Sequence, residues 1–313
     1  MAASAGSKFA DFLFRNLTVA CGFSVLLIVG LIFVELIQRS HLSLQKFGFA
    51  FFSGRSWDPV AGEFGSLPFI YGTVISSFLA LLLAVPLAVG LATFLTEMCS
   101  ISVRGPLSFI TELLAAIPSV IYGLWAIFVL VPLMRQYIQP GLARSFRWTG
   151  LFEGPAYGIG MLTAGVVLSI MIIPVISSIT REVLNAVARQ QREAALALGA
   201  TRWEMIRIAV LPNARTGIFG AIILGLGRAL GETMAVTMVI GNRAEIAKSL
   251  LAPGYSMASV IGNEFSEASD ELYLSALIEI GLALFLVTIV VNAAARLLVW
   301  STTRGVPASV HAQ

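Results

Sequence analysis

Six long runs of apolar residues dominate this sequence. They cover approximately residues 14–38, 70–97, 106–134, 158–184, 214–240 and 271–299. A helix of about 20 residues spans the roughly 30 Å hydrocarbon core of a bilayer, because each residue adds about 1.5 Å of length. The runs are continuous and show no ten-residue alternating segments, which favours helices over a barrel. We therefore expect an all-α, polytopic membrane protein with six transmembrane helices.

The composition supports this class and excludes others. Charged residues make up 12% of the 313 residues, against about 25% in soluble domains. Cys21 and Cys99 lie within or beside apolar runs, so no disulfide framework is predicted. The two histidines, His41 and His311, nearly exclude a histidine-based metal site, and we expect neither a metal nor a cofactor. No lysine follows a glycine, so the phosphate-binding loop of ATPases is missing and we do not expect an enzyme.

The basic residues predict the orientation. Cytoplasmic loops of membrane proteins carry an excess of lysine and arginine. With the N-terminus in the cytoplasm, eleven of these residues lie inside and eight outside, and six of the eleven lie in or directly beside the short loop between the fourth and fifth runs. We expect a multi-pass protein of the inner membrane of a prokaryote with both termini in the cytoplasm. The first run is too long for a cleaved signal, so it is interpreted as an anchor.

The loop between the fourth and fifth runs has a helix-turn-helix pattern. Residues 190–212 read QQREAALALGATRWEMIRIAVLP. Gly199 permits a tight reversal, and Thr201 with Glu204 three residues later predicts a capping box. Pro212 is expected to end the second helix before the fifth run.

Small side chains in the first of these helices suit contact with a partner. Glu193 is expected near the start of that helix, where an acid suits the helix dipole. Ala194 and Ala195 would let another protein approach closely. The residues alone also allow an ordinary amphipathic hairpin on the membrane surface.

Arg228 is predicted to lie deep in the bilayer. Counted from Arg215, it lies about 20 Å along the fifth helix. An arginine there costs about 2.5–3.5 kcal/mol on insertion scales, so it should face a partner charge or an aqueous passage. Glu232 is expected one turn further on the same helix face. Two interpretations remain: the two residues form a structural ion pair, or Arg228 attracts an anion that crosses the bilayer and Glu232 limits how strongly that anion is bound. Guanidinium suits tetrahedral oxyanions. Ser119, next to Pro118, predicts a helix break whose free backbone donors face the path.

Several motifs resemble one family. The EAA pattern, with a glycine four residues after it and Leu-Pro further on, is similar to the cytoplasmic motif of the permeases of ATP-binding-cassette importers. Four further stretches resemble the phosphate-specific permeases of the PstC type, at residues 56–59, 67–73, 113–123 and 227–236. The resemblance implies a type I (MetI-like) importer fold, with an anchor and outer loop over 1–69, the permease domain with its coupling loop over 70–304, and a cytoplasmic tail over 305–313.

The resemblance also implies partners and roles. The chain would pair with a PstA-like permease, two copies of a PstB-like ATPase in the cytoplasm and a PstS-like phosphate-binding protein outside. The docking element for the ATPase would consist of Glu193, Ala194, Ala195 and Gly199. Inorganic phosphate would then pass Arg228 by alternating access.

Three alternatives stay open. The chain could be the sister permease of the PstA type, or a permease for another oxyanion such as sulfate or molybdate, because Arg228 does not distinguish these anions. An autonomous ion-coupled carrier would use Glu232 and Glu279 as cation sites. Against that third alternative, no inverted repeat is visible, and the loop over 190–212 would have no purpose.

Overall fold

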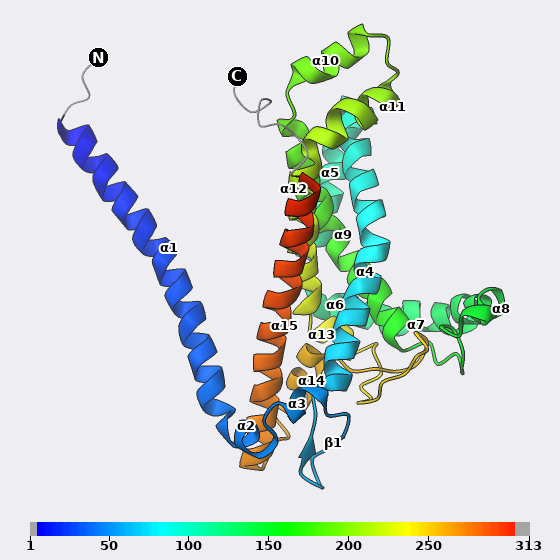
Figure 1. Ribbon diagram of the computed structural model, residues 1–313. Helices are drawn as coiled ribbons and strands as arrows, with labels where there is room; N and C mark the ends of the chain where they lie inside the picture. Colours follow the sequence, from blue (N-terminus) through cyan, green and yellow to red (C-terminus); the bar gives the residue numbers. More distant parts are fainter. Residues whose placement is uncertain (1–4, 304–313) are drawn as a thin grey trace.

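The computed structural model describes residues 5–303 and is mostly helical (Figure 1). Six helices in this part of the chain are long and apolar enough to cross a membrane. They are Asp11–Arg39, Leu67–Met98, Ser119–Ser145, Met161–Ala186, Arg202–Leu230 and Glu271–Ser301. The expected all-α fold with six candidate spans is confirmed, and the predicted tail over 305–313 lies outside the described residues.

The elements follow one another in a simple order. The chain begins with α1 (Ala5–Arg39), α2 (His41–Phe47), α3 (Ala50–Ser53) and a small antiparallel hairpin of β1 (Trp57–Asp58) and β2 (Glu63–Phe64). The bundle contains α4 (Leu67–Thr93) with a terminal π-helical turn η1 (Phe94–Met98), α5 (Ile101–Ala116), α9 (Met161–Ala186), α12 (Leu211–Leu230) and α15 (Glu271–Thr303). Shorter elements connect them: α6 (Ser119–Trp125), η2 (Ala126–Leu130), α7 (Val131–Leu133), η3 (Met134–Ile138), α8 (Gln139–Ser145), η4 (Arg147–Thr149), α10 (Arg189–Ala197), α11 (Arg202–Met205), η5 (Ile206–Val210), α13 (Met234–Thr237) and α14 (Met257–Glu264).

Helices α4 and α9 form the tightly packed centre of the bundle. Four alanines of α4 recur every fourth residue and are fully buried, so they form one face of the helix. In α9, a Cβ added to Gly165 would lie 2.8 Å from the Cβ of Leu79. Small side chains of this kind let two helix backbones approach closely in a membrane. The four alanines are Ala80, Ala84, Ala88 and Ala92.

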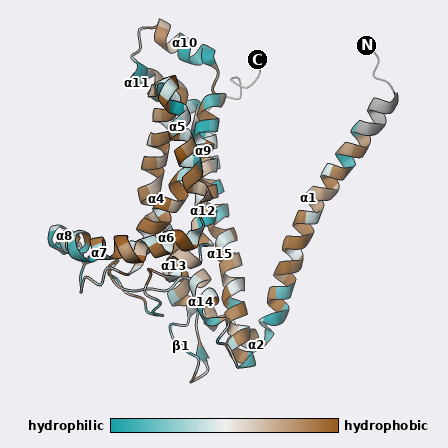
Figure 2. Cartoon of the chain, turned by 180° about the vertical axis from the view of Figure 1, so that it is seen from behind, coloured by the Kyte–Doolittle hydropathy of each residue, from teal (hydrophilic) through white to brown (hydrophobic). Residues whose placement is uncertain are grey.

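The third apolar run does not form the single span predicted over 106–134. Helix α5 ends at Ala116, and Ile117 is extended with φ −66° and ψ 128°. Pro118 explains the break, because it lacks an N–H and disfavours helical backbone in the residue before it. The helical stretch from α6 to α8 then runs sideways from the end of α5, across the bundle rather than along it (Figures 1 and 2).

The fifth apolar run also differs from its prediction at both ends. Pro212 does not end a helix: the chain is helical from Arg202 to Leu230. The π-helical turn η5 ends at Val210, two residues before Pro212, and such a wider turn accommodates the proline ring and its missing N–H. At the other end, α12 stops at Leu230 rather than at residue 240, with Gly231 as its C-cap.

The segments at the end of the bundle opposite α10 and α11 pack against each other (Figure 1). Trp57 in the hairpin donates from Nε1 to Oε2 of Glu264 at 2.9 Å, and the hydroxyl of Tyr273 donates to the same oxygen at 2.7 Å. Helix α1 contacts α15 through the stacked rings of Phe33 and Phe285, 5.4 Å apart. Its N-terminal part stands away from the bundle and begins at the end where α10, α11 and the last turns of α15 lie (Figure 1).

Candidate functional site: the α10–α11 loop and the end of α12

Helices α10 and α11 project from one end of the bundle as the predicted helix-turn-helix (Figure 1). Gly199 makes the reversal with φ +86°, a conformation that side chains disfavour. The predicted capping box is confirmed: Thr201 Oγ1 accepts from the Glu204 N–H at 3.3 Å, and Glu204 Oε2 accepts from the Thr201 N–H at 2.8 Å. The turn is therefore preorganised by local hydrogen bonds.

The four predicted docking residues divide into two groups. Glu193, Ala194 and Gly199 are exposed. Ala195 is only 7% exposed and belongs to the apolar cluster that joins this loop to the ends of α4 and α9, so its side chain holds the loop in place rather than facing a partner. Helix α10 begins at Arg189, which places Glu193 in the second turn and makes its predicted position at the helix start wrong.

The exposed surface of the loop is both apolar and basic. Leu198 is 91% exposed and Trp203 is 61% exposed. The side chains of Arg189 and Arg202 are exposed beside them, and Figure 2 shows hydrophilic residues gathered on α10 among apolar ones. Exposed aromatic and aliphatic side chains mixed with arginine are typical of protein-binding surfaces.

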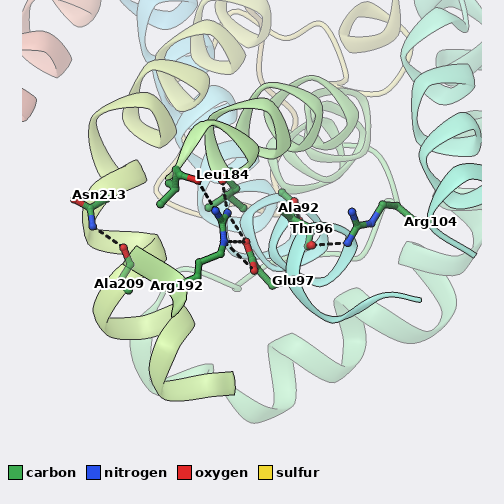
Figure 3. Close-up of polar contacts among 9 residues, drawn as sticks. Ala92, Thr96, Glu97, Arg104, Leu184, Arg192, Ala209 and Asn213 are labelled. Atoms are coloured by element: carbon green, nitrogen blue, oxygen red, sulfur yellow. Dashed lines mark hydrogen bonds and ion pairs between the residues drawn. The ribbon is translucent and has the colours of Figure 1, made fainter. Parts of the chain in front are cut away.

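Arg192 is a buried charge in this loop that our sequence analysis did not single out. Its Nη2 lies 2.8 Å from Oε1 of Glu97 in η1, and its Nε lies 3.2 Å from the same oxygen. Nη2 also donates to the carbonyl of Leu184 at 2.7 Å, and Nη1 donates to the carbonyl of Val187. Figure 3 shows this guanidinium between the end of α4 and the end of α9.

The environment of Arg192 accounts for its burial. The side chains of Arg192 and Glu97 are 17% and 7% exposed. A buried charge needs a partner and hydrogen bonds to offset its lost hydration, and Arg192 has both. The carbonyls at the end of α9 also favour a cation, because they carry the negative end of the helix dipole. The sequence signal was Glu97, an acid at the end of the second apolar run.

Arg228 and Glu232 do not share a helix face. Arg228 lies in the last turn of α12, whereas Glu232 follows the end of that helix and accepts a hydrogen bond from the Ala235 N–H at the start of α13, at 3.3 Å. No ion pair within residues 5–303 joins Arg228 to a carboxylate. The predicted i,i+4 arrangement is wrong because the helix ends at Leu230. The Arg228 side chain is exposed in the isolated chain.

The helix break lies close to Arg228. Pro118 caps α6, and Ser119 is its first residue and is half-buried. Helix α6 also packs closely on α13, since a Cβ added to Gly123 would lie 3.2 Å from the Cα of Ala235. The structure thus brings the broken helix and the Arg228 region together, although they are more than 100 residues apart in sequence.

This arrangement defines a class of protein. Six long apolar helices carry an exposed helix-turn-helix at one end and the exposed cation of Arg228 at the end of α12. It is the architecture of a transmembrane transport subunit. The family model of the binding-protein-dependent transport system inner membrane component matches residues 84–303, and the chain belongs to this family.

Curated relatives narrow the family further. The chain is 47% identical over 290 residues to the phosphate transport system permease protein PstC of Mesorhizobium japonicum, covering 91% of this chain and 89% of the relative. It is 47% identical to PstC of Pasteurella multocida, covering 92% and 91%, and 42% identical to PstC 2 of Mycobacterium tuberculosis, covering 94% and 93%. The chain is therefore a permease of the PstC type.

Solved structures show the same fold. A bacterial ABC transporter involved in the import of the acidic polysaccharide alginate matches with a TM-score of 0.62 at 17% identity, covering 95% of this chain and 100% of that one. An inward-facing MetNI methionine ABC transporter matches with a TM-score of 0.51 at 19% identity, covering 77% and 95%. The expected type I importer permease fold is confirmed.

Proposed function

We propose that this chain is one of the two permease subunits of an importer that moves inorganic phosphate into the cytoplasm by alternating access. The observation that carries the proposal is the near full-length similarity, at 47% identity, to phosphate transport permeases. The exposed cation of Arg228 at the end of α12 supports it, because an anion that crosses a bilayer needs a compensating charge.

The proposed partners follow from the two ends of the molecule. An ATPase subunit of the PstB type docks on the exposed surface of α10 and α11, through Glu193, Ala194 and Gly199, with Ala195 supporting the loop from beneath. A PstA-like permease completes the passage, two ATPase copies act in the cytoplasm, and a PstS-like phosphate-binding protein delivers the anion outside. The loop is basic, so this end and both termini lie in the cytoplasm.

Each charged or polar residue near the passage has a proposed role. Arg228 supplies a positive potential and bidentate donors for the passing oxyanion. Glu232 limits how tightly the anion is held, and Ser119 presents the first backbone donor of α6 at the helix break. The permease domain over 70–304 contains these residues, and the segment over 1–69 anchors the chain and forms the outer loop.

Reconstitution tests the proposal. The chain is purified with its sister permease and ATPase, placed in proteoliposomes and supplied with the binding protein. We expect ATP-dependent uptake of labelled phosphate that a tenfold excess of sulfate or molybdate does not reduce. Uptake of sulfate in preference to phosphate would assign the permease to another oxyanion, and uptake without ATPase subunits would indicate an autonomous carrier.

A further inference from the structure

Arg192 joins the exposed loop to two transmembrane helices at once. One guanidinium contacts the carboxylate of Glu97 at the end of α4 and the carbonyls of Leu184 and Val187 at the end of α9. Arg192 itself belongs to α10, the helix that carries Glu193 and Ala194. A force applied to α10 therefore has a direct, directional connection to both helices (Figure 3).

The two helices that receive this connection form one packed unit. The buried alanine face of α4 and Gly165 of α9 keep their backbones close over their length. A packed interface of this kind does not deform continuously, so a displacement at one end moves the pair as a body. The ends of α4 and α9 are thus the place where a small movement becomes a movement of the bundle centre.

The other contacts of the loop are less directional. Ala195, Met205 and Ile206 pack against Ala92 and Leu184 at the same end of the bundle. Apolar contacts keep surfaces together but do not select an orientation. The chain joins α10 to α9 through Val187 and Ala188, and to α12 through Gly199 and α11. It makes no direct link from α10 to α4, so α10 acts on α4 through the Arg192–Glu97 ion pair.

We propose that Arg192 is a positioning residue that transmits the displacement of α10 to the α4–α9 pair through Glu97 and the carbonyls at the end of α9. The inference rests on the proposed function, in which an ATPase moves α10. It predicts that breaking the Arg192–Glu97 pair leaves the ATPase bound and active but separates hydrolysis from transport.

The chemistry of the pair explains why arginine is needed. The guanidinium has five donors in a rigid plane, and here Nε, Nη1 and Nη2 all donate to protein acceptors. A lysine ammonium would keep the charge but cannot hold a carboxylate and two carbonyls in this fixed geometry. Arg192→Lys therefore tests geometry, and Glu97→Gln tests charge.

The experiment measures phosphate imported per ATP hydrolysed in proteoliposomes that contain the complete importer. For Arg192→Lys and Glu97→Gln we expect this ratio to fall at least about fivefold, the lower range of typical coupling between sites, with ATPase attachment unchanged. Glu112→Gln is the matched control. It removes the 2.6 Å ion pair between Arg181 of α9 and Glu112 of α5, which does not involve α10, so the ratio should stay at the wild-type value.

Replacing the ion pair by a covalent cross-link distinguishes a loss of mechanical transmission from a damaged fold. In a background with serine at positions 21 and 99, Glu97→Cys and Arg192→Cys are combined and joined by a short bis-maleimide. The ratio should be low before cross-linking and should rise after it. A low ratio caused only by a damaged fold would not respond to the cross-link.

The outcomes distinguish this inference from the proposed function. A wild-type ratio in Glu97→Gln or Arg192→Lys, or no recovery after cross-linking, overturns the transmission role while phosphate uptake by the wild-type importer still stands. Loss of assembly in all these variants also overturns it, because the pair would then serve the fold. If the wild-type importer moves no phosphate, the proposed function itself is wrong.

Discussion

The hydroxyl of Tyr122 donates a 2.7 Å hydrogen bond to the carbonyl oxygen of Leu114, across the helix break at Pro118. Leu114 lies four residues before Pro118, so in a continuous helix its carbonyl would accept from the N–H that proline lacks. Tyr122 is 7% exposed. The phenol therefore replaces a missing backbone donor and holds α5 and α6 at their present angle.

Tyr122→Phe should lower the thermal stability of the assembled permease. It leaves the Leu114 carbonyl with only the weak 3.4 Å contact from the Ile117 N–H, and the loss of a typical hydrogen bond costs about 0.5–1.5 kcal/mol. The measurement is the midpoint of thermal unfolding in nanodiscs. Tyr157→Phe, at a site 51% exposed, is the control, and equal midpoints for both variants would contradict the capping role.

Arg228→Gln should abolish or strongly reduce phosphate uptake, because it removes the cation at the end of α12. The importer should stay assembled, because none of the ion pairs among the described residues involves Arg228. Uptake of labelled phosphate and co-purification of the subunits are measured on the same preparation. Arg228→Lys should retain partial uptake, since charge remains but the planar fork is lost. Arg243→Gln, whose pair with Glu245 is exposed, should behave as wild type. Normal uptake by a well-expressed Arg228→Gln protein would refute an obligatory role for this charge.

Gly199→Asp should weaken or abolish attachment of the ATPase. The residue has φ +86° and no neighbour within 4 Å of an added Cβ, so the effect would come from backbone strain and a new charge at the docking turn rather than from a clash. Gly150→Asp is the matched control. Gly150 also has a positive φ of +69° and open space around it, but lies in the loop after η4. The measurements are pull-down of the ATPase and stimulation of its ATP hydrolysis. If Gly199→Asp retains both, the ATPase does not dock at this turn.

Trp57→Phe should loosen the connection between the β1–β2 hairpin and the end of α14. The indole N–H is lost, and with it one of the two donors that Glu264 accepts from, at a cost of about 1 kcal/mol for a typical hydrogen bond. We expect faster limited proteolysis of the outer loops and a lower unfolding midpoint. Trp148→Phe, at a site 84% exposed, should change neither measurement, and identical behaviour of the two variants would argue against the proposed tie.

Local features of the docking loop were predictable from sequence. The capping box of Thr201 and Glu204 and the reversal at Gly199 depend on residues no more than a few positions apart. The helical class was equally accessible, because runs of more than 20 apolar residues have few alternatives in a bilayer. The family resemblance, carried by short motifs, was confirmed by relatives over most of the chain.

Features that depend on how helices stop and turn were predicted wrongly. Residues 214–240 are apolar throughout most of their length, and Gly231 at the C-cap is not distinguished locally from the glycines inside the helix, such as Gly225 and Gly227. The end is stabilised by contacts beyond the run, including the Glu232 carboxylate on the Ala235 N–H and the close packing of α13 on Gly123. At Pro212 the opposite error occurred, because a π-helical turn lets the helix continue.

The sequence by itself determined that this chain forms membrane-spanning helices and carries a capped helical turn between two of them, because length, hydropathy and capping are local properties. Only the tertiary structure decided that Arg192 meets Glu97, 95 residues away, that Ala195 faces inward, and that Arg228 stands apart from Glu232. Those outcomes depend on how helix ends come together in space, and the hydropathy of a segment does not specify which other helix end it will contact.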